Sequence, residues 1–131
     1  MPNWCDNQVE IYCTCPEERE AVVEFLRGTI KESVIIEGEV HEQVVGLPVC
    51  FNSIVPLPDG EWDYDWCLEN WGCKWEPNVT GWNATEDEIF FTLMTPWSPP
   101  EGICFAIREK FPNIVVNWFY REDGLQIAGW L

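Results

Sequence analysis

The chain is built around one aromatic stretch, Trp62-Asp63-Tyr64-Asp65-Trp66-Cys67-Leu68-Glu69-Asn70-Trp71-Gly72-Cys73-Lys74-Trp75. Large aromatic side chains bury more apolar area than any others, so this segment is expected either to anchor a core or to form a binding face. The four-residue spacing of Trp62 and Trp66 places both rings on one side of a helix. Gly72 is a typical residue just after a last helical turn. The stretch therefore predicts a helix, a glycine stop and a strand over 73–75.

The same aromatic content predicts where the core lies. We expect most of five tryptophans to be substantially buried and to join the aromatic stretch to a sheet: Trp62, Trp66, Trp71, Trp75 and Trp97. At 131 residues the chain fits a single domain, spanning 1–131. Its composition, 47% hydrophobic and 15% aromatic, supplies a core and argues against disorder.

Apolar periodicity predicts the regular elements on both sides of this stretch. Alternation of apolar and polar residues predicts strands at 7–13, 79–83, 89–95, 114–120 and 125–130. Helices are predicted at 16–27 and 99–111, because each begins with a proline shortly after a capping residue, Thr14 or Ser98. This order of elements is the split βαβ, or ferredoxin-like, arrangement. We therefore expect an α+β fold in which two helices cover one face of an antiparallel sheet, with the aromatic helix as an addition.

Two segments between the first helix and the aromatic stretch have weaker patterns. Residues 33–46 predict two short strands around Glu37-Gly38-Glu39, which form a β-hairpin inserted into the domain. Residues 51–58 end in Pro56-Leu57-Pro58. Prolines at alternate positions exclude a central strand, so an extended and pinned loop is expected there.

The charge of the chain limits its partners. The sequence has 23 acidic and 7 basic residues, a formal net charge of −16, and the acids are spread through both halves. Such a surface repels phosphate backbones and acidic lipids, which argues against direct nucleic-acid binding and against membrane binding. A basic protein partner fits this field best, because complementary charge speeds encounter. Acidity also keeps a tryptophan-rich protein soluble, and this second interpretation stays open.

Cysteine and histidine content argues against catalysis and against a metal site. The seven cysteines, without a signal peptide or a membrane-spanning apolar run, are typical of reduced thiols in a cytoplasmic protein. Neither Cys13-x-Cys15 nor Cys67-x5-Cys73 matches the usual zinc spacing. His41 is the single histidine, and acidic surroundings raise the pKa of a thiol, so an activated cysteine nucleophile is not expected. We expect no enzyme activity, no structural metal and no cofactor.

Four motifs in one order carry a family resemblance. They are Met1-Pro2-Asn3-Trp4-Cys5-Asp6-Asn7, Phe51-Asn52-Ser53-Ile54-Val55-Pro56-Leu57-Pro58, Trp66-Cys67-x-x-Asn70-Trp71-Gly72-x-Lys74-Trp75 and Thr95-Pro96-Trp97-Ser98-Pro99-Pro100. Together they resemble the YubB-type, or Api-like, family of plasmid and phage proteins over most of the chain. The resemblance implies a ferredoxin-like domain without an iron–sulfur cluster, in a mobile-element protein of undetermined activity in the cytoplasm of a bacterial host. The chain departs from the family pattern at Cys73 and Pro96, where threonine and alanine are expected.

Two sets of residues are candidates for the function. The leading set is acidic, and would present dispersed carboxylates to a basic, nucleic-acid-handling host protein, as a DNA mimic or host-defence inhibitor does: Glu17, Glu18, Glu20, Glu24, Glu37, Glu39 and Glu42. The alternative set would line an amphipathic pocket for a nucleotide-like ligand, since nucleobases stack on aromatic walls: Asn3, Trp4, Asn52, Asn70, Trp71 and Trp97. Asparagine also commonly ties down loop backbone, which is a structural explanation for the second set.

Overall fold

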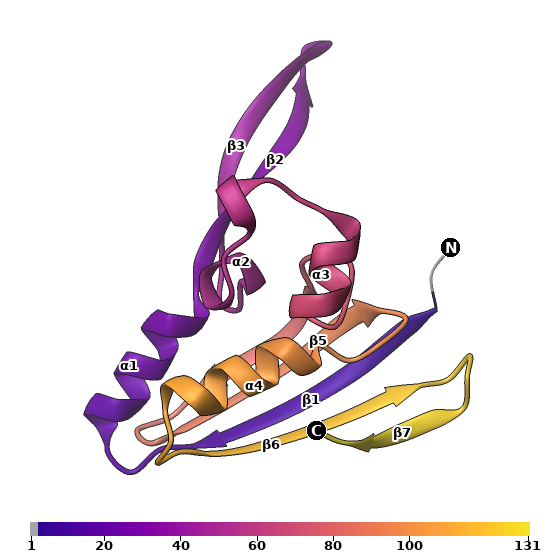
Figure 1. Cartoon of the computed structure of the whole chain (residues 1–131). Helices are drawn as coiled ribbons and strands as arrows, with labels where there is room; N and C mark the ends of the chain where they lie inside the picture. Colours follow the sequence, from indigo (N-terminus) through magenta and orange to yellow (C-terminus); the bar gives the residue numbers. More distant parts are fainter. Residues whose placement is uncertain (1–2) are drawn as a thin grey trace.

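The computed structural model describes residues 3–131; Met1 and Pro2, which open the first of the four motifs, lie outside the described residues. Within that range the fold is mixed α+β, with a five-stranded antiparallel sheet, a separate two-stranded hairpin and four α-helices (Figure 1). The predicted α+β class is therefore confirmed.

The large sheet has β1 at its centre, paired antiparallel to β5 and to β6, in the order β4-β5-β1-β6-β7. Its strands are β1 (Trp4–Tyr12), β4 (Asn78–Ala84), β5 (Glu88–Pro96), β6 (Val115–Glu122) and β7 (Ile127–Trp130). The hairpin consists of β2 (Gly28–Ile36) and β3 (Glu39–Leu47). The helices are α1 (Pro16–Leu26), α2 (Phe51–Ile54), α3 (Tyr64–Asn70) and α4 (Glu101–Lys110), with a 3₁₀ turn η1 (Pro58–Gly60).

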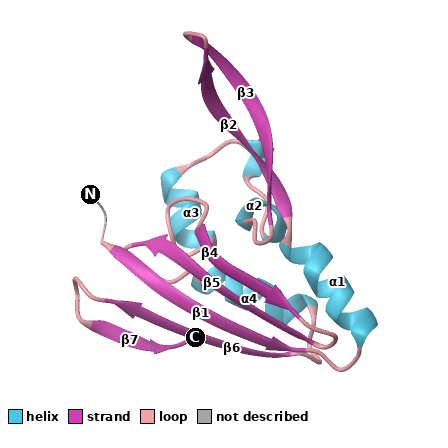
Figure 2. Ribbon diagram, turned by 180° about the vertical axis from the view of Figure 1, so that it is seen from behind, coloured by secondary structure: helices cyan, strands magenta, loops and turns pink. Residues whose placement is uncertain are grey.

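Helices cover only one face of the large sheet. Alternation along β1 turns Val9 and Ile11 towards the helices, where both are fully buried, and leaves Gln8 and Glu10 exposed on the opposite face. Leu26 of α1 and Ile107 of α4 belong to the same buried cluster. Figure 2 shows the opposite face of the sheet with no helix lying across it.

A buried polar network ties the sheet to the aromatic stretch. Nδ2 of Asn7 donates to Oγ1 of Thr95 (3.0 Å), and Oδ1 of Asn7 accepts from Nε1 of Trp118 (3.0 Å). Thr95 Oγ1 in turn donates to the carbonyl of Ser98 (2.7 Å), and Ser98 Oγ donates to the carbonyl of Gly72 (2.6 Å). The network satisfies buried groups that would otherwise destabilise the core.

The hairpin, residues 28–47, stands away from the large sheet as an arm (Figure 1). Its strands pair from Gly28–Leu47 to Ile36–Glu39, so they begin earlier than the predicted range of 33–46. The turn at the tip uses Glu37 and Gly38, both with positive φ (52° and 82°). This is the backbone that a two-residue hairpin turn requires.

The structure corrects the prediction for residues 51–58. The first four residues, Phe51–Ile54, form the helix α2 rather than an extended loop. The carboxylate of Glu76 accepts hydrogen bonds from the backbone N–H groups of Phe51 (2.6 Å) and Asn52 (2.9 Å) and so caps the first turn. A cap supplied from a distant part of the chain leaves no local pattern in the sequence.

The aromatic stretch also differs from its prediction. Helix α3 begins only at Tyr64, because Asp63 caps it by accepting from the backbone N–H of Trp66 (2.9 Å). Trp62 therefore lies outside the helix, and residues 73–75 form a bend instead of the predicted strand. Gly72 does end the helix in the predicted left-handed conformation (φ 94°).

The burial prediction is wrong for most of the five tryptophans. Trp71 is 1% exposed and Trp66 is half-buried, whereas Trp62, Trp75 and Trp97 are all exposed. The other fully buried indole is Trp118 of β6. Trp71 is buried against Phe51 of α2, and Trp118 is buried against Phe91 of β5, so part of the aromatic stretch is left on the surface.

Neither Thr14 nor Ser98 is the N-cap residue of the helix that follows it. The N-cap position of α1 is Cys15, while the backbone N–H and hydroxyl of Thr14 both donate to Glu18 Oε1 (2.8 and 2.9 Å). Helix α4 begins at Glu101, with Pro100 at its N-cap position. The hydroxyl of Ser98 is used by the buried network instead.

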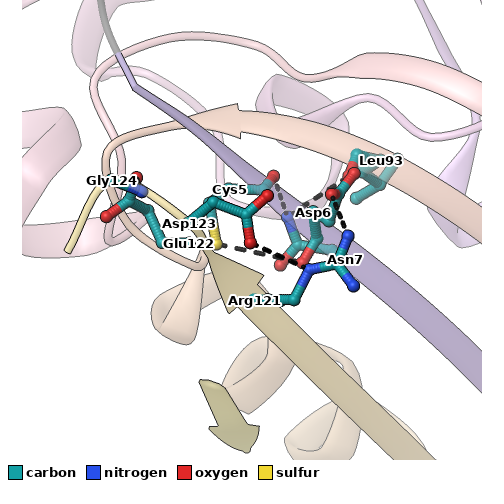
Figure 3. Close-up of polar contacts among 8 residues, drawn as sticks. All are labelled: Cys5, Asp6, Asn7, Leu93, Arg121, Glu122, Asp123 and Gly124. Atoms are coloured by element: carbon teal, nitrogen blue, oxygen red, sulfur yellow. Dashed lines mark hydrogen bonds and ion pairs between the residues drawn. The ribbon is translucent and has the colours of Figure 1, made fainter. Parts of the chain in front are cut away.

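A buried carboxylate holds the last hairpin turn. Glu122, at the end of β6, accepts from the backbone N–H groups of Gly124 (2.9 Å) and Leu125 (2.6 Å). Strand β7 begins only at Ile127 instead of residue 125. On the surface beside Glu122, the Arg121 guanidinium lies 3.4 Å from Asp6 and 3.1 Å from Asp123 (Figure 3).

Candidate functional site

The seven predicted acids lie on two elements, four on α1 and three on the arm. Those on α1 are Glu17, Glu18, Glu20 and Glu24, and those on the arm are Glu37, Glu39 and Glu42. All are exposed except Glu18, which is partly buried because it holds the backbone and hydroxyl of Thr14. The structure thus separates the set into a helix group and an arm group.

Arginines pair with two of the four helix acids, whereas none of the three arm acids has an arginine partner among the described residues. Arg19 lies 3.1 Å from Glu20, and Arg27 pairs with Glu24. On the arm, the ion pair found among the described residues joins His41 to Glu39 (3.7 Å), and it is charged only when the histidine is protonated. The arm therefore presents negative charge that is less compensated than that of α1.

The arm also exposes apolar side chains beside these carboxylates. Ile35 is 77% exposed and Val40 is 71% exposed, and the two lie directly opposite each other across the strands. Val44 is exposed on the same face and Ile36 on the other. A two-stranded hairpin with both faces in water is marginally stable by itself. Exposed apolar residues rimmed by polar ones are typical of an interaction site.

The six residues of the predicted pocket do not line one cavity. Asn52 and Trp71 line a cavity of about 830 Å³ between the arm and the aromatic stretch, whereas Asn70 lines a different hollow, of about 530 Å³, beside α4. Trp4, Asn3 and Trp97 line neither. The Trp4 ring lies 6.5 Å from that of Trp75, and the backbone N–H of Trp97 donates to the carbonyl of Asn3 (2.8 Å).

Two of these asparagines form hydrogen bonds to nearby backbone groups, which agrees with the structural explanation for the second set. Oδ1 of Asn52 accepts from the backbone N–H of Leu57 (2.8 Å), and Nδ2 of Asn70 donates to the carbonyl of Trp66 (2.9 Å). Each bond fixes a loop or a helix end.

The larger cavity, which we call the aromatic cavity, combines Asn52 and Trp71 of the predicted pocket with residues that the sequence did not assign to it. It is lined by Thr29, Ile30, Lys31, Val44, Asn52, Leu57, Gly60, Trp62, Trp71, Trp75 and Glu76. Indole rings and aliphatic side chains from two distant segments make most of this lining. The available signal was the dipeptide Trp75-Glu76, which places a carboxylate directly after an indole.

Glu76 is the single carboxylate that lines the aromatic cavity. Its oxygens accept the two α2 backbone N–H groups and, from 3.6 Å, the thiol of Cys50. Burial raises the pKa of Glu76, because removal from water disfavours the charged form more than these hydrogen bonds favour it.

Burial makes several of the cysteine thiols poor nucleophiles. Burial raises the pKa of Cys5 from an ordinary value near 9 to about 11, and burial followed by the charge of Glu18 raises that of Cys13 to about 11. No group of three or more His, Cys, Asp or Glu within residues 3–131 is arranged to hold a metal ion. No helix in the same range is long and apolar enough to cross a membrane.

Thiol alkylation tests this property, since the thiolate is the reacting form. At pH 8, a pKa raised from about 9 to about 11 lowers the thiolate fraction about 100-fold, so Cys13 in the folded protein should react about 100 times more slowly with iodoacetamide than in urea. Peptide mass spectrometry after timed quenching measures the rate. Equal rates for Cys13 in the folded and the unfolded chain would contradict the expectation.

No protein-family model, curated protein or solved structure matches this chain in the comparisons made with each. The YubB-type resemblance therefore stays an expectation from the sequence motifs.

Proposed function

We propose that this chain is a binding protein whose arm engages a basic protein, with nucleic-acid-handling host proteins as its partner class. The observation that carries the proposal is the combination of uncompensated carboxylates and exposed β-branched side chains on the arm, in Glu37, Glu42, Ile35 and Val40. Carboxylates attract and orient a cationic surface. Apolar side chains at the centre of such a contact supply affinity once water is excluded.

Dispersed carboxylates on a projecting arm can imitate the phosphates of DNA and occupy a cationic groove. A net charge of −16 makes association with a basic surface fast at low salt. A protein of this kind would act as an inhibitor of host defence. The resemblance to plasmid and phage proteins supports that role and supports a bacterial cytoplasm as its place of action.

We also propose that the fold is ferredoxin-like. The strand order β4-β5-β1-β6, with α1 after β1 and α4 after β5, supports this proposal. The arm, α2 and α3 then form an insertion between the first helix and the second strand of the motif. Strand β7 adds a fifth strand at one edge.

Capture from bacterial lysate tests the proposed function. The purified chain is immobilised, and bound proteins are eluted at about 50 mM and at about 500 mM salt, where screening lengths differ about threefold. We expect a basic protein that binds at low salt and is released at high salt, because charge attraction between exposed groups is screened. Mass spectrometry of the eluates identifies the protein and its isoelectric point.

The same capture is repeated with a double variant, Ile35→Ser and Val40→Ser. This variant removes exposed apolar side chains from the arm but keeps its charge. It should capture less of the same protein even at low salt. Recovery of neutral or acidic proteins alone, or recovery that is indifferent to salt and to the serine changes, would overturn the proposal.

A further inference from the structure

One wall of the aromatic cavity is an indole ring that is held in place by the protein and still faces solvent. Trp62 is 56% exposed. Its Nε1–H donates a hydrogen bond to the carbonyl of Lys74 (2.6 Å), which fixes the ring. Trp75 lines the same cavity, and the Lys74 ammonium lies 4.3 Å from the centre of its ring. Indole faces attract cations through their quadrupole, and the Lys74 contact is one such pair.

The carboxylate in this cavity retains one acceptor site. An ionised carboxylate has about four lone-pair sites. Three donors reach Glu76, from Phe51, Asn52 and Cys50. A cation placed in the cavity would offset the unfavourable burial of this charge.

We propose that the aromatic cavity binds an organic cation, a quaternary ammonium or a guanidinium group, between the Trp62 ring and the Glu76 carboxylate. Its apolar walls, Leu57, Ile30 and Val44, would contact the carbon body of the ligand. A phosphate-bearing ligand fits poorly, because Glu76 already occupies the backbone donors at the start of α2. Lys31, the cation that lines the cavity, is exposed on β2 and opposes a cationic ligand.

Two sources can supply this chemistry: a free small cation, or a cationic side chain of the basic partner. The second source rests on the proposed function, and the first does not. Titration of the purified chain with a small cation therefore tests the cavity even if no protein partner is found.

The probe is choline, compared with 3,3-dimethylbutan-1-ol, its neutral carbon isostere. NMR of the indole N–H signals follows the titration, and the variant Trp62→Leu assigns the Trp62 signal. We expect choline to shift that signal saturably and the isostere to bind at least about fivefold more weakly, since only choline gains the cation–π and carboxylate interactions.

Three substitutions test the proposal, and the two that remove a charge, Glu76→Gln and Lys31→Gln, should have opposite effects on a cationic and on an anionic ligand. Trp62→Leu, followed by the indole N–H signals that remain in this variant, should weaken choline binding at least about threefold, and Glu76→Gln should weaken it further. Lys31→Gln should strengthen it about twofold, because a like charge is removed. Trp62 and Lys31 are exposed, so these two variants keep the test valid if Glu76→Gln unfolds α2. Trp130→Leu, at an exposed indole away from the cavity, is the matched control and should leave binding unchanged.

The result that overturns the proposal is equal binding of choline and its isostere, no saturable shift, or weaker binding after Lys31→Gln. To separate the two sources, choline is added to the captured complex. Release of the basic protein from the wild-type chain but not from Trp62→Leu assigns the cavity to a partner side chain. Retention of the protein, with choline bound, assigns it to a free cation.

Discussion

Replacing Trp71 with alanine is expected to lower the free energy of unfolding by about 3–5 kcal/mol, the usual cost of removing a large aromatic ring from a core. Trp71 is 1% exposed and packs edge-on against Phe51 and Trp66, at 5.6 and 6.1 Å between ring centres. Its Nε1 donates to the carbonyl of Val55 (2.8 Å), so the variant also leaves that acceptor without a partner. Urea denaturation followed by far-ultraviolet circular dichroism measures the change.

Trp130→Ala is the control for this experiment, because Trp130 is 70% exposed on the edge strand β7. This variant should lower the free energy of unfolding far less than Trp71→Ala, although the centre of the Trp130 ring lies 5.1 Å from that of Phe119. Equal losses for the two variants would show that Trp71 does not anchor the aromatic stretch to the core.

Gly102→Ala is expected to destabilise the fold by about 3 kcal/mol, the upper end of the range for overpacked sites. A Cβ at residue 102 would overlap the backbone oxygen of Asn70 and lie 2.7 Å from the adjoining carbonyl carbon. These are backbone atoms, which cannot move aside as a flexible side chain does. The backbone N–H of Gly102 also donates to the carbonyl of Trp71 (3.0 Å), so the contact between α3 and α4 would be disturbed.

The matched control is Gly46→Ala in β3, where a Cβ would meet no atom within 4 Å. Thermal unfolding of the two variants should give a large drop in Tm for Gly102→Ala and a change near zero for Gly46→Ala. A wild-type Tm for Gly102→Ala would mean that α3 and α4 do not approach as closely as described.

The strands of the large sheet were predictable because their signal is local. Val9 and Ile11 alternate with polar residues, and the same alternation marks Phe91 and Trp118 as inward-facing. The elements that the sequence misplaced depend on distant partners. The helix α2 exists because Glu76, more than twenty positions further along the chain, caps it, and no pattern near Phe51 contains that information.

Exposure of tryptophan is not a local property either. Trp62 and Trp71 lie in one stretch of similar composition, but only Trp71 packs under α2, next to Phe51. The division of the acids between α1 and the arm was not predicted, because the sequence left all seven in one set. Arg27 follows Glu24 by three positions, a spacing at which helical side chains meet, and the structure shows that the two do pair. The aromatic cavity was not predictable, since it forms where the arm and the aromatic stretch come together.

The central claim is that the arm, and not the helix, carries the partner-binding charge. Two triple variants with the same change in net charge test it: E37Q/E39Q/E42Q on the arm and E17Q/E20Q/E24Q on α1. Affinity for the captured basic protein is measured for both by calorimetry at low salt. We predict that the arm variant loses at least about tenfold in affinity and the helix variant less than about threefold, because local charge complementarity outweighs net charge. Equal losses, or a larger loss for the helix variant, would contradict the claim.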